Sequence, residues 1–362
     1  MRVERVDNVN GLISLEEPWE ALLSRCSSKE INLFLSYYWV SAWWTHFGEG
    51  KKIWLLLVKE NEEIIGIAPL MLSREKYNGM PVRMLGFLVN KHTSRADFII
   101  PERKHEVMYA LVSYLADTSK CWDVLRLLHI PKESGNMALL ETELQKNSKF
   151  RCFPVETSNI LYSLPLTTTW KEYLSCQTLK FRKNIRYYRN QLIKTENFKF
   201  QKFSDVKDAP ISMDLLFDLE KLSWKAEEKT ARMTFEETLF YKDLAGKFAL
   251  LRGLDNRFLL IDNKITGGLN NLIYHGTVYS LLTYYDDNFQ NVSVGRNIYI
   301  DILQEYMNDN TLTKLDFNGE SLFVRTWTKD CTSFEMISAC NSNSYSRLIS
   351  ALKIIKRKAC RK

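Results

Sequence analysis

Hydrophobic and polar positions along the chain predict two similar series of strands and helices. In the first series we expect helices at 14–24 and 37–47, strands at 53–59, 63–72 and 82–90, a helix at 104–116, a strand at 123–130 and a helix at 136–146. In the second we expect strands at 257–262, 264–274 and 277–286, a helix at 295–307, a strand at 313–317, a helix at 321–328 and a strand at 333–339. Turn-forming pairs such as Asn61-Glu62 and Asp262-Asn263 separate the strands.

The two series share a local pattern as well as an order of elements. Ile64-Ile65-Gly66-Ile67 in the first corresponds to Ile265-Thr266-Gly267-Gly268 in the second. We interpret them as two copies of one β-β-β-α-β unit, and a chance similarity of two hairpins is the alternative. The expected fold is a mixed α+β fold whose two halves are joined by a helical segment.

The residues between the two copies, 170–250, have mainly helical patterns. The helix expected at 178–194 has an apolar stripe and a separate basic stripe of Arg182, Arg186 and Arg189.

A second helix of this segment is expected at 213–228, with Trp224 near its end, and the last residues, 346–362, form a basic amphipathic segment. We therefore divide the chain into an N-terminal half at 1–165, a C-terminal half with the helical insert at 166–345, and the tail at 346–362.

Composition and charge narrow the class of protein. The 362 residues are 45% hydrophobic and 26% charged, with a net charge of +7, which excludes a disordered chain, a collagen-like fibre and a small disulfide scaffold. This mild excess is weaker than a DNA-binding domain usually shows, so we expect no DNA partner. Seven cysteines without a Cys-x-x-Cys pair, and five histidines without metal-ligand spacing, indicate no disulfide framework and no metal site. The absence of a signal sequence and of long apolar runs predicts a cytoplasmic protein.

The segment after the strand at 277–286 has the features of an anion site. The loop Gln290 to Arg296 leads directly into a helix, and the first N–H groups of a helix are free and lie at the positive end of its dipole. Gly295 allows close approach of a ligand to the backbone, and Arg296 in the first turn is favourable only beside an anion. An ordinary strand–helix turn is the alternative.

The hairpin, long strand, loop and helix together resemble the GNAT acyltransferase core. Gln290-x-x-Ser293-x-Gly295 is similar to the GNAT loop Gln/Arg-x-x-Gly-x-Gly/Ala, with Ser293 in place of the first glycine. Leu315-Asp316-Phe317-Asn318-Gly319-Glu320, followed by Phe323, Arg325 and Trp327, resembles the signature of the BioF2-like, CelD-like branch of cellulose and exopolysaccharide biosynthesis. Segments 39–44 and 181–189 agree with this branch. Its two GNAT-like halves, which the related FemAB aminoacyltransferases share, would explain the repeat.

The resemblance implies that acetyl-CoA or another acyl-CoA is the co-substrate. Its pyrophosphate would bind the loop, and its pantetheine would pair with the backbone of the long strand. The implied binding residues are Leu282, Thr283, Gln290, Ser293, Val294, Gly295 and Arg296. The first copy has no such loop, because Pro101-Glu102 precedes its helix without a glycine, so we assign it a role in shaping the substrate site.

For the base that takes the proton of an attacking amine, we favour Asp316 or Glu320. In the strand at 313–317, Leu315 and Phe317 share one face, so Asp316 lies on the other, although buried strand carboxylates are often held in structural hydrogen bonds. Tyr285 is a candidate donor, for which packing in the sheet is the alternative.

Phe323 and Val324 stand where the branch usually has Tyr and Lys. These two departures from the pattern bear on whether this protein is active and on whether it takes the substrate usual for the branch.

The basic stripe has three interpretations: a solvated face, a site for an anionic substrate, or a contact with tRNA. Our candidate substrate-binding residues are Arg182, Arg186, Arg189 and Trp224. The tail at 346–362 is either a solubilising segment or a contact with anionic lipid that would place the protein peripherally at the inner face of the membrane.

Three functions follow from these patterns. The first is transfer of an acyl group from CoA to an amine, on a small molecule or glycan precursor such as an amino sugar or envelope-polysaccharide precursor. The second is a FemAB-like transfer from aminoacyl-tRNA to a cell-wall precursor. The third is an inactive GNAT scaffold in polysaccharide assembly.

Overall fold

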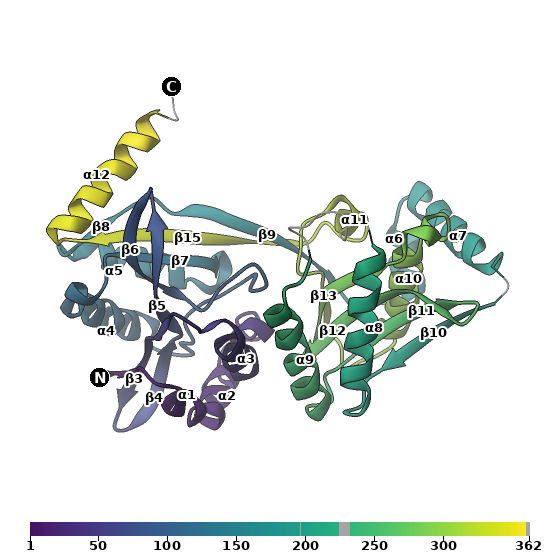
Figure 1. The fold of residues 1–362 in the computed structure, drawn as a ribbon, viewed down its shortest axis with the longest axis horizontal. Helices are drawn as coiled ribbons and strands as arrows, with labels where there is room; N and C mark the ends of the chain where they lie inside the picture. Colours follow the sequence, from purple (N-terminus) through teal and green to yellow (C-terminus); the bar gives the residue numbers. More distant parts are fainter. Residues whose placement is uncertain (196, 224–231, 360–362) are drawn as a thin grey trace. The chain divides into compact units, whose positions relative to one another are not determined.

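The computed structural model of the chain describes residues 1–195, 197–223 and 232–359, with only the backbone for 352–359. It consists of two compact units (Figure 1). Unit 1 contains Met1–Ile160 and Thr332–Lys362, and unit 2 contains Leu161–Cys331. The chain thus leaves unit 1 within one strand, β9 (Glu156–Pro165), and returns at the start of another, β15 (Cys331–Asn341). Our predicted halves followed the order of the sequence and placed residues 332–345 with the C-terminal half.

Unit 1 is built on a mixed sheet with strand order β15-β7-β6-β5-β2, on which β8 pairs with β15, and on a separate sheet β1-β3-β4. The strands are β1 (Arg2–Val6), β2 (Lys52–Ile53), β3 (Leu55–Glu60), β4 (Glu63–Ala68), β5 (Leu70–Tyr77), β6 (Met80–Phe87), β7 (Val124–Pro131) and β8 (Phe150–Cys152). The helices are α1 (Val9–Ile13), α2 (Glu16–Ser24), α3 (Tyr37–Phe47), α4 (Lys104–Asp117), α5 (Asn136–Lys146) and α12 (Ser344–Ala359). Leu111, Leu125 and Leu140 lie in the core that joins α4 and α5 to the sheet.

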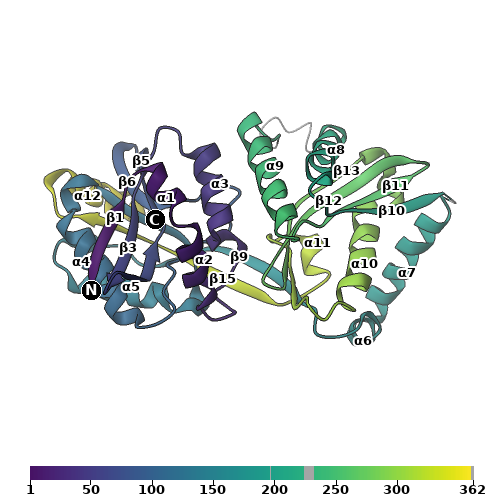
Figure 2. The ribbon, with the colours of Figure 1, turned by 90° about the horizontal axis from the view of Figure 1, so that it is seen from below.

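Unit 2 has one sheet with strand order β10-β11-β12-β13-β14-β9. Its strands are β10 (Phe198–Phe203), β11 (Asn256–Ile261), β12 (Lys264–Tyr274), β13 (Thr277–Tyr285) and β14 (Lys314–Asp316). Its helices are α6 (Trp170–Cys176), α7 (Leu179–Ile193), α8 (Asp208–Leu222), α9 (Phe235–Leu250), α10 (Val294–Tyr306) and α11 (Leu322–Arg325). Figure 2 shows α8 and α9 on one face of this sheet and α7 and α10 on the other.

The predicted repeat and the mixed α+β class are confirmed by the topology. In unit 1, α4 lies between β6 and β7 along the chain, and the two strands pair in parallel, with Met84 opposite Val124. In unit 2, α10 lies between β13 and β14 along the chain, and these strands also pair in parallel, with Val278 opposite Leu315.

Four two-residue turns explain why the hairpins of both copies form. Asn61-Glu62, Asn78-Gly79, Asp262-Asn263 and His275-Gly276 all have positive φ at both positions. Such turns match the twist of antiparallel strands, and Asn, Asp and Gly adopt them at low cost. This is the reason that turn signals in the sequence located the hairpins correctly.

Several predicted elements differ from the structure. The strand expected at 53–59 is divided into β2 and β3, which lie in different sheets. The strand expected at 63–72 is two strands, because Pro69 lies between β4 and β5 and cannot donate to a ladder. The helix expected at 213–228 is α8, which begins at Asp208 and ends at Leu222. Pro210 lies in its first turn, where a missing N–H costs nothing. No helix in the part of the chain that the structure describes is long and apolar enough to cross a membrane.

Asp97 is a buried carboxylate in the core of unit 1 and is 2% exposed. It accepts hydrogen bonds from Asn136 Nδ2 at 2.9 Å and from the Phe98 N–H at 2.8 Å. Burial nevertheless dominates and raises the pKa of Asp97 from 3.8 to about 7. The folded state therefore holds this proton more tightly than the unfolded chain does.

We expect Asp97→Asn to remove a pH dependence of stability. A raised pKa contributes stability that is complete below pH 3.8 and is lost as the pH rises to about 7. The shift corresponds to a free energy on the order of 4 kcal/mol. In urea unfolding between pH 4 and 8, wild type should lose stability relative to Asp97→Asn as the pH rises. Asp117→Asn, at an exposed position of α4, is the control, and parallel pH curves for wild type and Asp97→Asn would contradict the expectation.

Candidate functional site

Strand β13 in unit 2 has one edge that is only partly paired. It faces β14 through three residue pairs, of which Tyr279–Asp316 is the last, and β14 ends there. From residue 280 to residue 285, the described structure contains no strand on this side of β13. An extended, amide-containing ligand could pair with these backbone groups, in the manner of an added strand.

A β-bulge lies at the point where the edge becomes free. On the other side of β13, Asn270 pairs with Leu282 and Asn271 pairs with Ser280, so Leu281 has no partner. A bulge bends a strand and changes the direction of its side chains. Ser280 directly precedes the bulge, and its hydroxyl lies 2.8 Å from the hydroxyl of Tyr299 on α10.

The loop between β13 and α10 contains a left-handed residue and is bound by a side chain of α10. It contains a 3₁₀ turn, Asp287–Val292, and then Ser293, which has φ 54° and ψ 50°. This left-handed conformation usually favours glycine, which explains why related loops have a glycine there. The buried amide of Asn297 donates to the Val292 carbonyl at 2.8 Å and to the Tyr188 carbonyl on α7 at 3.1 Å.

The first turn of α10 is open. Among the described residues, no group accepts a hydrogen bond from the backbone N–H of Val294, Gly295 or Arg296. The turn contains no acidic residue, so the positive end of the helix dipole is uncompensated. A Cβ built on Gly295 would have no atom within 4 Å, so the space in front of this turn is free.

The corresponding helix of unit 1 differs in this respect. Arg103, before α4, has φ 51°, so the backbone enters both helices in the same way. Glu106 lies in the first turn of α4 and pairs with Arg103, which also pairs with Glu60 at 2.6 Å. Unit 1 thus has a carboxylate in this first turn, whereas the first turn in unit 2 has none.

Aromatic side chains surround the start of α10. The guanidinium of Arg296 lies 4.9 Å from the ring centroid of Tyr188 and 5.4 Å from that of Phe323. Phe323 in turn packs on Tyr299 and Trp327. Phe323 and the buried Val324 therefore have packing roles here.

The other predicted ligand-binding positions lie along this same strand and loop. Leu282 and Val294 are buried, Thr283 and Ser293 are half-buried, and Gln290 is exposed. The structure thus brings the predicted loop and strand positions together, although Leu282 and Val294 would contribute backbone rather than side chains.

The three catalytic candidates have different environments. Asp316 is 3% exposed at the end of β14, and it accepts a hydrogen bond from the Asn318 N–H at 2.9 Å. Glu320 is exposed and pairs with Arg325. Tyr285 packs against the core beside Gly267. Asp316 is therefore the carboxylate beside the point where β13 and β14 separate.

The neighbouring Tyr284 faces the opposite side of the sheet. Its hydroxyl donates to Glu220 of α8 at 3.2 Å, and burial raises its pKa well above the usual range.

The basic stripe of α7 does not act as one surface. Arg189 turns inward, 3.5 Å from Asp301 of α10 and 5.1 Å from the ring of Phe200. Arg182 donates to the Ser175 carbonyl at 3.3 Å, and Arg186 is exposed. Trp224, the fourth predicted substrate-binding residue, lies outside the described residues. Among the described residues, no group of His, Cys, Asp and Glu side chains is placed to hold a metal ion.

Sequence reasoning missed the residues that support this site from α10. Asn297 ties the start of the helix to the loop and to α7, and Tyr299 bonds to Ser280 of the sheet. The signal available was a polar Asn adjoining the apolar face, which needs a partner when buried.

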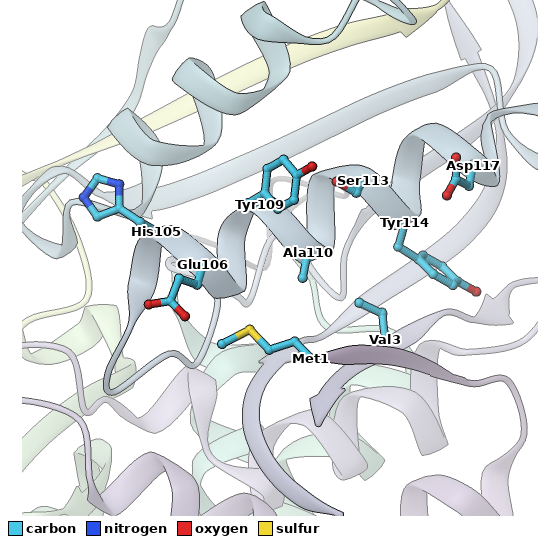
Figure 3. Close-up of a pocket in the computed structure, with 9 residues that line it drawn as sticks. All are labelled: Met1, Val3, His105, Glu106, Tyr109, Ala110, Ser113, Tyr114 and Asp117. Atoms are coloured by element: carbon cyan, nitrogen blue, oxygen red, sulfur yellow. The ribbon is translucent and has the colours of Figure 1, made fainter. Parts of the chain in front are cut away.

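A different cavity, of about 590 Å³, lies in unit 1 along α4 and β1 (Figure 3). His105 and Glu106 lie at one end of the drawn set and Asp117 at the other, with the apolar Met1, Val3 and Ala110 between them. No predicted site residue lines it.

Comparison with known proteins supports a GNAT-type domain in unit 2. Residues 180–322 match a family described as Acetyltransferase (GNAT) domain. This segment includes β13, the loop, α10 and Asp316. No curated protein matches the sequence significantly.

Solved structures share the fold of the whole chain at low sequence identity. FemX has a TM-score of 0.60 and 12% identity, with 92% of this chain and 96% of that chain covered. The C-terminal domain of a putative lysylphosphatidylglycerol synthetase from Agrobacterium fabrum has a TM-score of 0.54 and 11% identity, with 95% of this chain and 97% of that domain covered. L-PGS from Bacillus licheniformis has a TM-score of 0.53 and 14% identity, with 94% of this chain and 96% of that chain covered. The chain therefore has a GNAT-type acyltransferase fold, and the BioF2-like, CelD-like branch stays a prediction.

Proposed function

We propose that this protein transfers an acyl group from acyl-CoA to an amine. The observation that carries the proposal is the position of the free edge of β13 directly before the open first turn of α10. The pyrophosphate would accept hydrogen bonds from the N–H groups of residues 294–296, and the amide-containing pantetheine would extend along residues 280–285. The match of residues 180–322 to a GNAT domain supports this assignment.

The chemistry would be direct transfer. The amine attacks the thioester carbonyl, a C–N bond forms, the C–S bond breaks, and the amine loses a proton while the CoA thiolate gains one. Positioning of the two reactants would supply much of the acceleration. We assign Asp316 as the base because it lies beside the separating strands, whereas Glu320 is exposed and already paired with Arg325.

The acceptor proposed is an amino sugar or envelope-polysaccharide precursor. Its support is the resemblance to the CelD-like branch. The exposed Arg186 of α7 suits an acceptor that carries negative charge. A peripheral position at a membrane, through the basic tail at 346–362, is a further part of this proposal.

Gly295→Asp should weaken CoA binding by about 100-fold or more, because a carboxylate would occupy the space in front of the N–H groups and repel the pyrophosphate. Isothermal titration calorimetry with CoA measures this. Gly246→Asp in α9 is the matched control, since a Cβ at Gly246 also has no atom within 4 Å. Absence of CoA binding to folded wild type, or equal losses in both variants, would contradict the proposal.

Asp316→Asn should lower kcat by about 100-fold or more with any acceptor that supports turnover, because the amide still accepts the Asn318 hydrogen bond but cannot take a proton. Release of free thiol from acetyl-CoA measures the rate. Glu320→Gln should have a small effect. Unchanged kcat in Asp316→Asn would exclude this role.

A second candidate function is transfer from aminoacyl-tRNA, as the FemAB resemblance implies. It is favoured by the exposed cations of α7, Lys180, Lys183 and Arg186, and by the fold similarity to FemX. The third candidate, an inactive scaffold, is favoured by the packing of Phe323 and Val324 where polar residues are usual. Turnover that depends on Asp316 would exclude it.

The tRNA hypothesis predicts strong, salt-dependent tRNA binding that Arg182→Glu with Arg186→Glu reduces. Two lost phosphate contacts should lower the slope of log K against log salt concentration by about 2. Arg189 stays unchanged because it pairs with Asp301. Lys207→Glu with Lys329→Glu, at exposed positions of the same unit, is the charge-matched control. If wild type does not bind tRNA in filter binding at low salt, this hypothesis fails.

A further inference from the structure

Unit 1 contains a basic cavity that is separate from the proposed acyl-transfer site. Its volume is about 810 Å³, and it is formed by the end of β1, the end of α3 and the strands β2, β5 and β6. The charged residues that line it are five cations and one carboxylate: Arg5, Lys51, Lys52, Arg74, Arg83 and Asp7. No residue of unit 2 lines it.

The strand register places three of these cations on one face. Arg74 on β5 pairs directly with Arg83 on β6, and Lys52 on β2 pairs with Leu72, two residues before Arg74. Side chains at directly opposed and alternate positions share a face of the sheet. Like charges opposite each other destabilise a strand pair, and Asp123, which pairs with Arg83, reduces this repulsion.

The protein itself neutralises only part of this charge. Arg83 pairs with Asp123 at 2.8 Å, Arg5 pairs with Asp7 at 2.9 Å, and Lys51 donates to the Phe47 carbonyl at 2.6 Å. Lys52 and Arg74 are exposed and have no ion pair among the described residues. Two cations are therefore available for a ligand, and Lys51, which is held by a carbonyl and not by a carboxylate, adds positive charge beside them.

Two tryptophans provide an apolar wall to the same cavity. Trp54 is 5% exposed, and the guanidinium of Arg5 lies 4.4 Å from its ring centroid. Trp44 of α3 is half-buried and lines the cavity as well. Flat aromatic walls beside cations suit a ligand that combines a ring with an anionic group.

We infer that this cavity binds a phosphate-bearing sugar, with the phosphate at Lys52 and Arg74 and the ring against the tryptophans. The same headgroup could be soluble or attached to a lipid, and its recognition by the cavity would be the same. The inference does not depend on acyl transfer, since the cavity consists only of unit 1 residues. It gives the N-terminal half a ligand of its own.

The test is calorimetric titration of the full chain with glucose 1-phosphate and with inorganic pyrophosphate. Lys52→Glu and Arg74→Glu should each weaken binding by about tenfold or more, since each loses a charge-assisted hydrogen bond and gains repulsion. Lys132→Glu, at an exposed position of unit 1 that does not line the cavity, should bind like wild type. Gly295→Asp should bind glucose 1-phosphate like wild type, which separates this site from the acyl-CoA site, where the same substitution weakens binding.

A second arm identifies the source of the phosphate. Vesicles of phosphatidylglycerol are compared with vesicles of phosphatidylcholine, each with and without glucose 1-phosphate as competitor. Binding of the soluble sugar phosphate alone supports a soluble ligand, and vesicle binding that Arg74→Glu weakens but Lys132→Glu does not supports a lipid headgroup. Absence of binding to every probe, or equal effects of Arg74→Glu and Lys132→Glu, overturns the inference.

Discussion

The proposed site depends on the early end of β14. A parallel strand that continued alongside β13 would satisfy its backbone groups and close the edge. Because β14 pairs through only three residues, residues 280–285 keep one edge free while β12 holds the other. The bulge at Leu281 and the Ser280–Tyr299 hydrogen bond fix the strand at the point where the partner is lost.

The two copies use one backbone design with opposite electrostatics. Each has a parallel strand pair joined through a helix that begins after a left-handed residue, Arg103 or Ser293. In the first copy Glu106 compensates the start of the helix, and in the second no acidic residue does. A difference of one charged side chain thus separates a helix start that has its own carboxylate from one whose first turn has none.

The sequence was informative where local physics decides the structure. The four hairpin turns and the start of α10 were predictable because backbone conformation there depends on residues such as Asn78-Gly79 and Ser293. The roles of Arg189 and Phe323 were not predictable, because their partners Asp301 and Tyr299 are distant in sequence. The position of β15 in unit 1 was not predicted for the same reason. The pattern of a strand does not show which other strand it will pair with.

Cations that form ion pairs within the fold differ in function from cations that remain available to bind ligands. Arg257 is bound by Asp255 and by both oxygens of Glu305, so it fastens β11 to the end of α10 and adds little to the external field. Among the described residues, Lys52 and Arg74 have no ion pair, and they share one face of the sheet with Arg83, whose charge Asp123 compensates. A fold tolerates such an arrangement at a cost in stability, and a bound anion would offset that cost. The net charge of +7 therefore acquires functional meaning only after its internally paired cations are set aside.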